Sequence, residues 1–304
     1  MKSSELLFMK AEKKRVGTKA QIGPEKGRER RIAKAIFLII ILSSVAFSVY
    51  FGYTILSSSP DVSFIKPTRQ FKPENPNPEL KAAIVDQVSL TFPNQTFIQT
   101  AADILEKANY SLDYYSSERV VVEFYRNLPR YGYGIIVLRV HSSASGGETQ
   151  AQRVEVPVVL FTSEPYSNTK YVSEQLAGQV FPVSYDVPNP PYYFAIGPSF
   201  VTSCMNGKFQ NTLIIMMGCE GLTNTKMAEA LREKGAKAYI SWNGSVSANH
   251  TDQATTQLLQ HLVAEAQTIK QAVENTIKEI GPEPAYNNTL EYYPLESENY
   301  AIQN

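Results

Sequence analysis

The stretch from Leu213 to Gly221, LIIMMGCEG, constrains the fold more than any other part of the chain. Five bulky apolar side chains in a row predict a strand that is buried on both faces of a sheet. The run ends at Gly218, Cys219 follows directly, and Thr223 to Lys234 has helical spacing. This order presents Cys219 at the carboxyl end of a central strand, where open α/β sheets bind their ligands. We expect the following helix N-terminus and a nearby imidazole to lower the pKa of that thiol.

A second strand-like run, Gly134 to Val140, ends at His141 and is followed by Ser142 and Ser143. Each of these two strand ends therefore carries one half of a Cys/His pair. A thiol and an imidazole on neighbouring strand ends favour nucleophilic catalysis, in which the ring receives and returns the proton.

Short apolar runs alternate with helical patterns along the rest of the chain. This alternation, with short links, predicts an α/β fold with a mostly parallel sheet and helices on both faces. The segment Val120–Leu128 fits either a strand or a helix, and its valines favour a strand. One apolar stripe from Thr251 to Ile280 predicts a single long helix. The remaining predicted strands are 81–86, 110–115, 154–161 and 236–242, and the other predicted helix is 97–108.

The amino-terminal part of the chain predicts one transmembrane helix before this domain. Residues 35–56 form an uncharged run of 22 residues, long enough to cross the hydrocarbon core of a bilayer. Residues 1–34 hold eleven Lys or Arg and four Glu, and this basic region is too long for an ordinary cleaved signal peptide. We therefore expect a retained signal anchor in the cell membrane, with a basic cytoplasmic tail and the domain outside.

Three further segments complete the expected domain organisation. Residues 57–80 are rich in Pro and Ser and predict an extended stalk. Residues 81–280 form the globular domain that contains both strand ends, and residues 281–304 form an acidic, Tyr-rich tail. Five Asn-x-Ser/Thr sequons beyond the membrane segment agree with an external location.

The chain has only two cysteines, Cys204 and Cys219. In an exported domain a disulfide between them competes with a catalytic thiol.

The pairing of a hydrophobic block ending in His141-Ser142 with a later one ending in Gly218-Cys219 resembles the caspase-like cysteine peptidases. This clan holds caspases, metacaspases, clostripain, gingipain, separase and CHAT domains. Downstream, a helix, a Gly-Ala, a strand and a Trp-containing end follow the CHAT-like order over about residues 80–265; the matching segments are MAEAL at 227–231, GAKA at 235–238 and Ser241-Trp242. Two departures stand out: Ser142 replaces the family glycine, and the interval of 78 residues between His141 and Cys219 is longer than in caspases.

The resemblance implies a caspase-like three-layer sandwich and assigns roles to single residues. His141 would be the general base and acid, Cys219 the nucleophile, and the backbone amides of Ser142 and Cys219 the oxyanion donors. Trp242 and Asp252 fall where the family often builds its S1 pocket, which would favour Arg or Lys at P1. Both have ordinary alternatives, because a Trp packs at strand ends and an acid at a helix start interacts favourably with the helix dipole.

The sequence thus predicts a single-pass, membrane-anchored cysteine endopeptidase that acts on a protein or peptide substrate. No metal and no cofactor is expected, since motifs for zinc, phosphate or a serine elbow are missing from the sequence. A net charge of zero gives no indication of nucleic acid. The alternative is a catalytically inactive surface binding module on the same fold, held closed by a Cys204–Cys219 disulfide.

Overall fold

The computed structural model describes residues 80–144, 156–185 and 189–302. The predicted basic tail (1–34), membrane segment (35–56) and most of the stalk (57–80) lie outside these residues. Within the described part, no helix combines the length and apolarity needed to cross a membrane.

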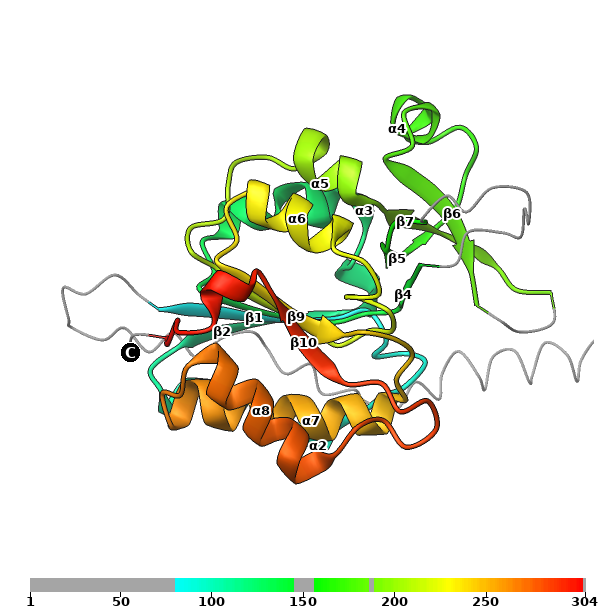
Figure 1. Ribbon diagram of the computed structural model, residues 1–304. Coiled ribbons are helices and arrows are strands. Elements are labelled where there is room, and N and C mark those ends of the chain that lie inside the picture. Colours follow the sequence, from blue (N-terminus) through cyan, green and yellow to red (C-terminus); the bar gives the residue numbers. More distant parts are fainter. Residues whose placement is uncertain (1–79, 145–155, 186–188, 303–304) are drawn as a thin grey trace, which may run out of the picture. The chain divides into compact units, whose positions relative to one another are not determined.

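A six-stranded sheet with the strand order β10-β9-β8-β3-β1-β2 forms the centre of the described chain (Figure 1). Five strands run parallel and β10 is antiparallel to β9. The mostly parallel sheet predicted from the sequence is therefore confirmed. Its strands are β1 (Lys81–Asp86), β2 (Ser111–Ser116), β3 (Ile135–Arg139), β8 (Leu213–Met216), β9 (Ala238–Trp242) and β10 (Leu290–Tyr293).

Helices cover both faces of this sheet, which gives the three layers expected (Figure 1). On one face, residues such as Tyr125, Phe200 and Met227 form one hydrophobic cluster with the sheet. On the other face, the cluster contains Leu258 and Val273. The first face carries α3 (Val122–Asn127), α5 (Pro198–Cys204) and α6 (Lys226–Glu233), and the second carries α2 (Gln95–Lys107), α7 (Ala248–Leu259) and α8 (Ile269–Ile280). Every residue of β3 and β8 is buried, as the unbroken apolar runs predict.

The segment between the two candidate strands builds a second, smaller sheet in the order β4-β5-β7-β6. Its first strand directly follows His141, so this sheet begins at the carboxyl edge of the main sheet (Figure 1). Its elements are β4 (Ser142–Ser143), β5 (Val159–Pro165), α4 (Val172–Leu176), β6 (Val180–Ser184) and β7 (Tyr192–Ile196).

Two expected elements differ in the structure. Val120–Leu128 contains helix α3, because the Glu164 carboxylate on β5 accepts a hydrogen bond from the Val122 amide and satisfies the start of the helix. The expected single helix over Thr251–Ile280 is two helices, α7 and α8, which pack against each other. The chain breaks at Ala266, whose φ is +50°, and Thr268 starts α8 with a capping box.

Residues 281–304, which the sequence sets apart as a tail, contribute β10 to the main sheet. Leu290 pairs with Trp242 and Tyr293 pairs with Tyr239 in antiparallel register. Leu290 is also buried in the hydrophobic cluster under α7 and α8.

Candidate active site

The carboxyl ends of β3 and β8 lie side by side, as the pairing of the two strands requires. The hydroxyl of Ser142 donates a hydrogen bond of 2.5 Å to the carbonyl oxygen of Cys219. A Cβ on Gly218 would lie 2.3 Å from both Ser142 Oγ and the Val140 carbonyl oxygen. Glycine at position 218 therefore lets the two strand ends approach this closely.

A second contact, between the segments that follow the two strand ends, extends this junction. The Glu220 carboxylate accepts a hydrogen bond of 2.6 Å from the Ala144 amide. Glu220 has a φ of +61°, the left-handed region that side chains rarely adopt. The turn after β8 is thus held in an uncommon conformation against the segment that follows His141.

The thiol of Cys219 is half-buried and contacts the loop between β9 and α7. Its Sγ lies 3.4 Å from both the carbonyl oxygen and the amide nitrogen of Val246. Burial raises the pKa of the Cys219 thiol, the Glu220 and Glu283 carboxylates add to this, and the hydrogen bond from Val246 opposes it. The expectation of a lowered pKa is wrong, since α6 begins only at Lys226 and burial, with the Glu220 and Glu283 carboxylates, outweighs the Val246 hydrogen bond.

The imidazole of His141 sits among aromatic side chains. Its ring centroid lies 4.8 Å from that of Tyr185, 5.8 Å from that of Phe92 and 5.9 Å from that of Phe161. Burial lowers the pKa of His141 to about 4, and the nearby Arg139 guanidinium contributes. The ring is therefore neutral at physiological pH, and its Nε2 is buried without a hydrogen-bond partner among the described residues.

The structure brings the two strand ends together without joining the two side chains. In the described part of the chain, the imidazole of His141 and the thiol of Cys219 share no hydrogen bond. The backbone carbonyl of Cys219 is engaged by Ser142, whereas no described residue accepts a hydrogen bond from its amide. That amide is one of the two oxyanion donors that the sequence analysis expects.

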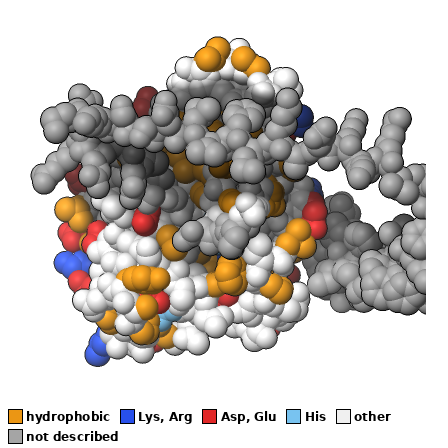
Figure 2. All heavy atoms as spheres, turned by 90° about the vertical axis from the view of Figure 1, so that its right-hand side faces the viewer, with side chains coloured by type: hydrophobic (Ala, Val, Ile, Leu, Met, Phe, Trp, Pro, Cys, Tyr) orange, Lys and Arg blue, Asp and Glu red, His pale blue; other side chains and the backbone are white. Residues whose placement is uncertain are grey.

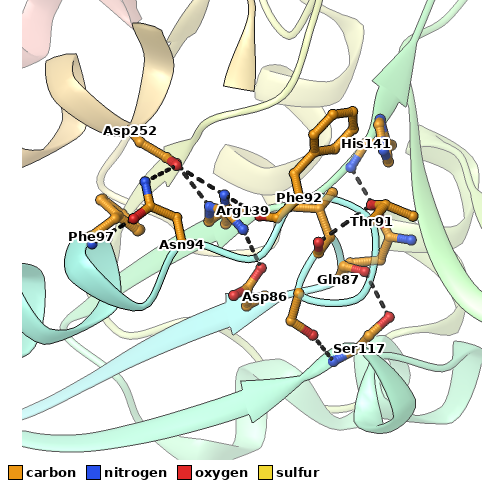
Figure 3. Close-up of polar contacts among 12 residues, drawn as sticks. Asp86, Gln87, Thr91, Phe92, Asn94, Phe97, Ser117, Arg139, His141 and Asp252 are labelled. Carbon is orange, nitrogen blue, oxygen red and sulfur yellow. Dashed lines mark hydrogen bonds and ion pairs between the residues drawn. The ribbon is translucent and has the colours of Figure 1, made fainter. Parts of the chain in front are cut away.

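Asp252 lies in a buried ion cluster. Its two carboxylate oxygens lie 2.8 Å and 2.9 Å from Nε and Nη2 of Arg139, and Asn94 donates a further hydrogen bond of 2.8 Å. Arg139 Nη1 reaches Asp86 at 2.8 Å (Figure 3). We call Asp86, Arg139 and Asp252 the ion triad. Each of its side chains is at most 5 % exposed, so the expected role of Asp252 in the S1 pocket has no support in this geometry.

Arg139 and Asp86 were not singled out from the sequence, although both carry a signal. Each is buried at the end of a strand, directly after a run of apolar residues, and a buried charged residue needs a partner. Arg139 also donates a hydrogen bond of 2.7 Å to the carbonyl oxygen of Phe92. The triad therefore holds the loop that carries Phe92 toward His141 (Figure 3).

Trp242 is a core residue with 1 % of its surface exposed. Its indole nitrogen donates a hydrogen bond to Thr251, and its ring lies 5.3 Å from that of His250. This packing at the end of β9 agrees with the ordinary alternative for Trp242 and leaves no surface for a substrate.

Cys204 and Cys219 are both free thiols. Cys204 packs against the cluster that contains α3, α5 and α6, and Cys219 packs against the cluster under α2, α7 and α8. The main sheet separates these clusters, and a disulfide needs Cα atoms within about 7 Å. The disulfide proposed for the inactive alternative is therefore not formed.

The edge of the sheet toward which the parallel strands run carries exposed apolar side chains. Figure 2 turns this side toward the viewer, and hydrophobic side chains reach the surface there in several groups. Leu90 is 68 % and Phe92 is 50 % exposed, both on the loop that follows β1.

Two cavities, of about 260 Å³ and 340 Å³, have linings that share Asn211 and Lys237. The larger also touches Leu80 and Gly134, which precede β1 and β3, so it lies at the opposite edge from Cys219. Within the described ranges, no three His, Cys, Asp or Glu side chains are grouped to hold a metal ion.

No family model and no curated protein matches the chain. Among solved structures, the crystal structure of the Arg-specific cysteine proteinase gingipain R matches with a TM-score of 0.40 and 11 % identity. That match covers 73 % of this chain and 44 % of the gingipain chain, so this protein spans less than half of its length. Protein GSU0716 from Geobacter sulfurreducens matches with a TM-score of 0.38 and 8 % identity, over 73 % of this chain and 97 % of that one. At these scores the fold class rests on the strand order and layers of the chain itself.

Proposed function

We propose that this protein is a membrane-anchored cysteine peptidase that uses Cys219 as nucleophile and His141 as general base and acid. The observation that carries the proposal is the junction of β3 and β8. There Gly218 and the Ser142 hydroxyl fix a thiol-bearing strand end against a histidine-bearing one. The sequence pattern at these two ends resembles that of caspase-like peptidases, which supports the same assignment.

The charges of the resting pair determine how the reaction would begin. A thiol with a raised pKa and an imidazole with a lowered pKa are both neutral at pH 7. The sulfur would bond to the scissile carbonyl carbon while the thiol proton passes to the imidazole, with the oxyanion stabilised by the Cys219 amide. The C–N bond then breaks, the imidazole protonates the leaving amine, and water hydrolyses the thioester. Since the two side chains share no hydrogen bond, substrate binding must bring them into contact.

The same neutral pair favours a second candidate function. A protein on this fold that binds a peptide without cleaving it needs neither an ionised thiol nor a thiol–imidazole contact. This candidate is the inactive binding module of the sequence analysis, without its disulfide.

Cleavage of a peptide library by the full-length chain separates the two functions. We expect Cys219→Ala and His141→Ala each to lower kcat/KM by at least about 1,000-fold, as loss of a nucleophile or base does in other peptidases. Cys204→Ala is the matched control and should cleave like the wild type. A peptidyl electrophile should label Cys219 only while His141 is present. Binding of peptides with neither cleavage nor His141-dependent labelling would establish the binding module.

Attachment to the membrane is part of the proposal. Residues 35–56 would span the bilayer, with residues 1–34 in the cytoplasm and the stalk 57–80 carrying the domain outside. Alkaline carbonate should leave the full-length chain in the membrane pellet. A double variant, Val45→Lys with Phe47→Lys, should release it, since each charge near the span centre costs about 2.5–3.5 kcal/mol on insertion scales. Release of the wild type by carbonate would contradict an integral anchor.

A further inference from the structure

Gln87 is a buried polar side chain that contacts the surroundings of His141 from two sides. Its Oε1 accepts a hydrogen bond of 3.0 Å from the backbone amide of His141 (Figure 3). Its Nε2 donates one of 3.0 Å to the phenol oxygen of Tyr185. Tyr185 is the aromatic residue whose ring lies nearest to the imidazole, at 4.8 Å.

The backbone of Gln87 is fixed as well. The hydroxyl of Ser117 donates a hydrogen bond of 2.7 Å to the Gln87 carbonyl oxygen, and it also contacts Ser163 Oγ at 2.6 Å. Gln87 is 2 % exposed, and it directly follows the last residue of β1. Gln87, at the end of β1, is therefore linked to the ends of β3 and β6 by its two side-chain hydrogen bonds.

The imidazole itself has no polar partner that would set its orientation. Its Nε2 is buried and unpartnered, and no described carboxylate bonds to either ring nitrogen. Its orientation thus depends on Phe92, Phe161 and Tyr185. Of these three, Tyr185 is the one whose polar end is tied to the same residue that holds the His141 backbone.

We propose that Gln87 is the positioning residue of the candidate active site. It fixes the imidazole of His141 by holding both the His141 amide and the Tyr185 ring that packs against the imidazole. The inference rests on the proposed function for its catalytic meaning, whereas the positioning itself is a property of the fold. In many enzymes a carboxylate orients the histidine; here an amide side chain and an aromatic ring take that part.

The direct test is a pH titration of the His141 ring in the full-length chain in detergent. NMR of ¹³C-labelled histidine monitors the protonation of the ring. The chain has three histidines, and His141→Ala assigns the signal. Gln87→Met removes both hydrogen bonds at nearly constant volume. It should let water reach the ring and raise the His141 pKa by about one unit from its value near 4. The charged and titratable groups around the ring are Arg139 on its own strand and Tyr185 beyond β6.

Two variants separate positioning from a general loss of stability. Tyr185→Phe keeps the ring and loses only the hydrogen bond, so it should shift the titration less than Tyr185→Ala. Gln99→Met, on the exposed face of α2, is the matched control and should leave the His141 titration unchanged. The signals of His250 and His261 should not move in any of these variants.

The activity readout is a drop in kcat of about 10- to 100-fold for Gln87→Met with little change in KM, because a misplaced base slows the chemical step. An unchanged His141 titration in Gln87→Met, with only a lower melting temperature, would overturn the inference. A shifted titration in a chain that cleaves no peptide would uphold the positioning and refute the peptidase. The two proposals therefore fail independently.

Discussion

The carboxyl edge of the main sheet holds two polar groups of opposite character. In the ion triad, every charged side chain is paired at 2.8–2.9 Å, and Asn94 and Tyr114 add hydrogen bonds to the carboxylates. In the pair of His141 and Cys219, the imidazole has an unpartnered buried nitrogen and the thiol has only weak contacts with Val246. Fully bonded polar networks rigidify a fold, whereas a buried polar atom without a partner is costly and is rare unless it has a role. The comparison therefore separates a saturated structural cluster from the candidate catalytic pair on the same edge.

The largest effect on stability is expected from a substitution in the ion triad. Arg139→Met leaves two buried carboxylates without their counter-charge and should lower the free energy of unfolding by about 3–5 kcal/mol. Urea denaturation measures this value. Glu123→Gln is the control, since the half-exposed Glu123 forms a surface pair with Arg126 and should cost less than about 1 kcal/mol. An equal loss of unfolding free energy in the two variants would show that the triad stabilises the fold no more than a surface ion pair does.

Acid titration of stability tests the unsaturated side. The pKa of His141 is about 4 in the fold and 6.5 in an unfolded chain, so the unfolded state alone takes up a proton between these values. The free energy of unfolding should therefore fall as pH drops from 6.5 to 4, by up to about 3 kcal/mol, and the contribution should be constant below pH 4.

Subtracting the pH profile of His141→Phe isolates this contribution. Burial raises the pKa of Asp86, which acts in the opposite direction, because the fold then keeps a proton that the unfolded chain releases. A difference profile that is flat from pH 6.5 to 4 would show that the imidazole is not protected by its aromatic surroundings.

The reactivity of the thiol sharpens the comparison further. In a Cys204→Ala background, the rate of alkylation of Cys219 by iodoacetamide should rise about tenfold per pH unit between pH 7 and 9, because the raised pKa keeps the thiol protonated there. A shoulder near neutral pH in the plot of alkylation rate against pH would instead reveal a preformed thiolate–imidazolium pair. The resting state of the two side chains would then be charged.

The smallest effect is expected at the margin of the triad. Asn94 caps α2 by accepting a hydrogen bond from the Phe97 amide, and it also donates one to Asp252. Asn94→Ala should lower the free energy of unfolding by about 1 kcal/mol, the usual value for a lost cap. Guanidinium denaturation compares it with Gln99→Ala on the same helix. A loss as large as that of Arg139→Met would show that the triad depends on its neighbours as much as on its charges.

The strands that carry the candidate site were predictable because their signal is local. Unbroken apolar runs before His141 and Cys219 indicate strands buried on both faces, and both strands occur where expected. Helix α3 was not predictable in this way, since its start is satisfied by Glu164, 42 residues further along the chain. The break between α7 and α8 was hidden because Leu262 and Ile269 continue the same apolar stripe, although the capping box at Thr268 marks it.

The chemistry of the site depends on how deeply its side chains are buried, and the local sequence does not predict that burial. The motif alone places Asp252 near a substrate pocket, yet its partner Arg139 lies 113 residues earlier in the chain. The direction of the Cys219 pKa shift likewise follows from its burial and from the neighbouring Glu220 and Glu283.

The separation of Cys204 and Cys219 by the main sheet determines how this protein responds to oxidants. An oxidised Cys219 has no second thiol in its own chain to condense with, since Cys204 lies under the opposite face. A sulfenic acid there can be reversed only by a thiol from another molecule. Covalent dimers on a non-reducing gel would accordingly report encounters between two chains, and a reductant supplied from outside would control recovery of the sulfur.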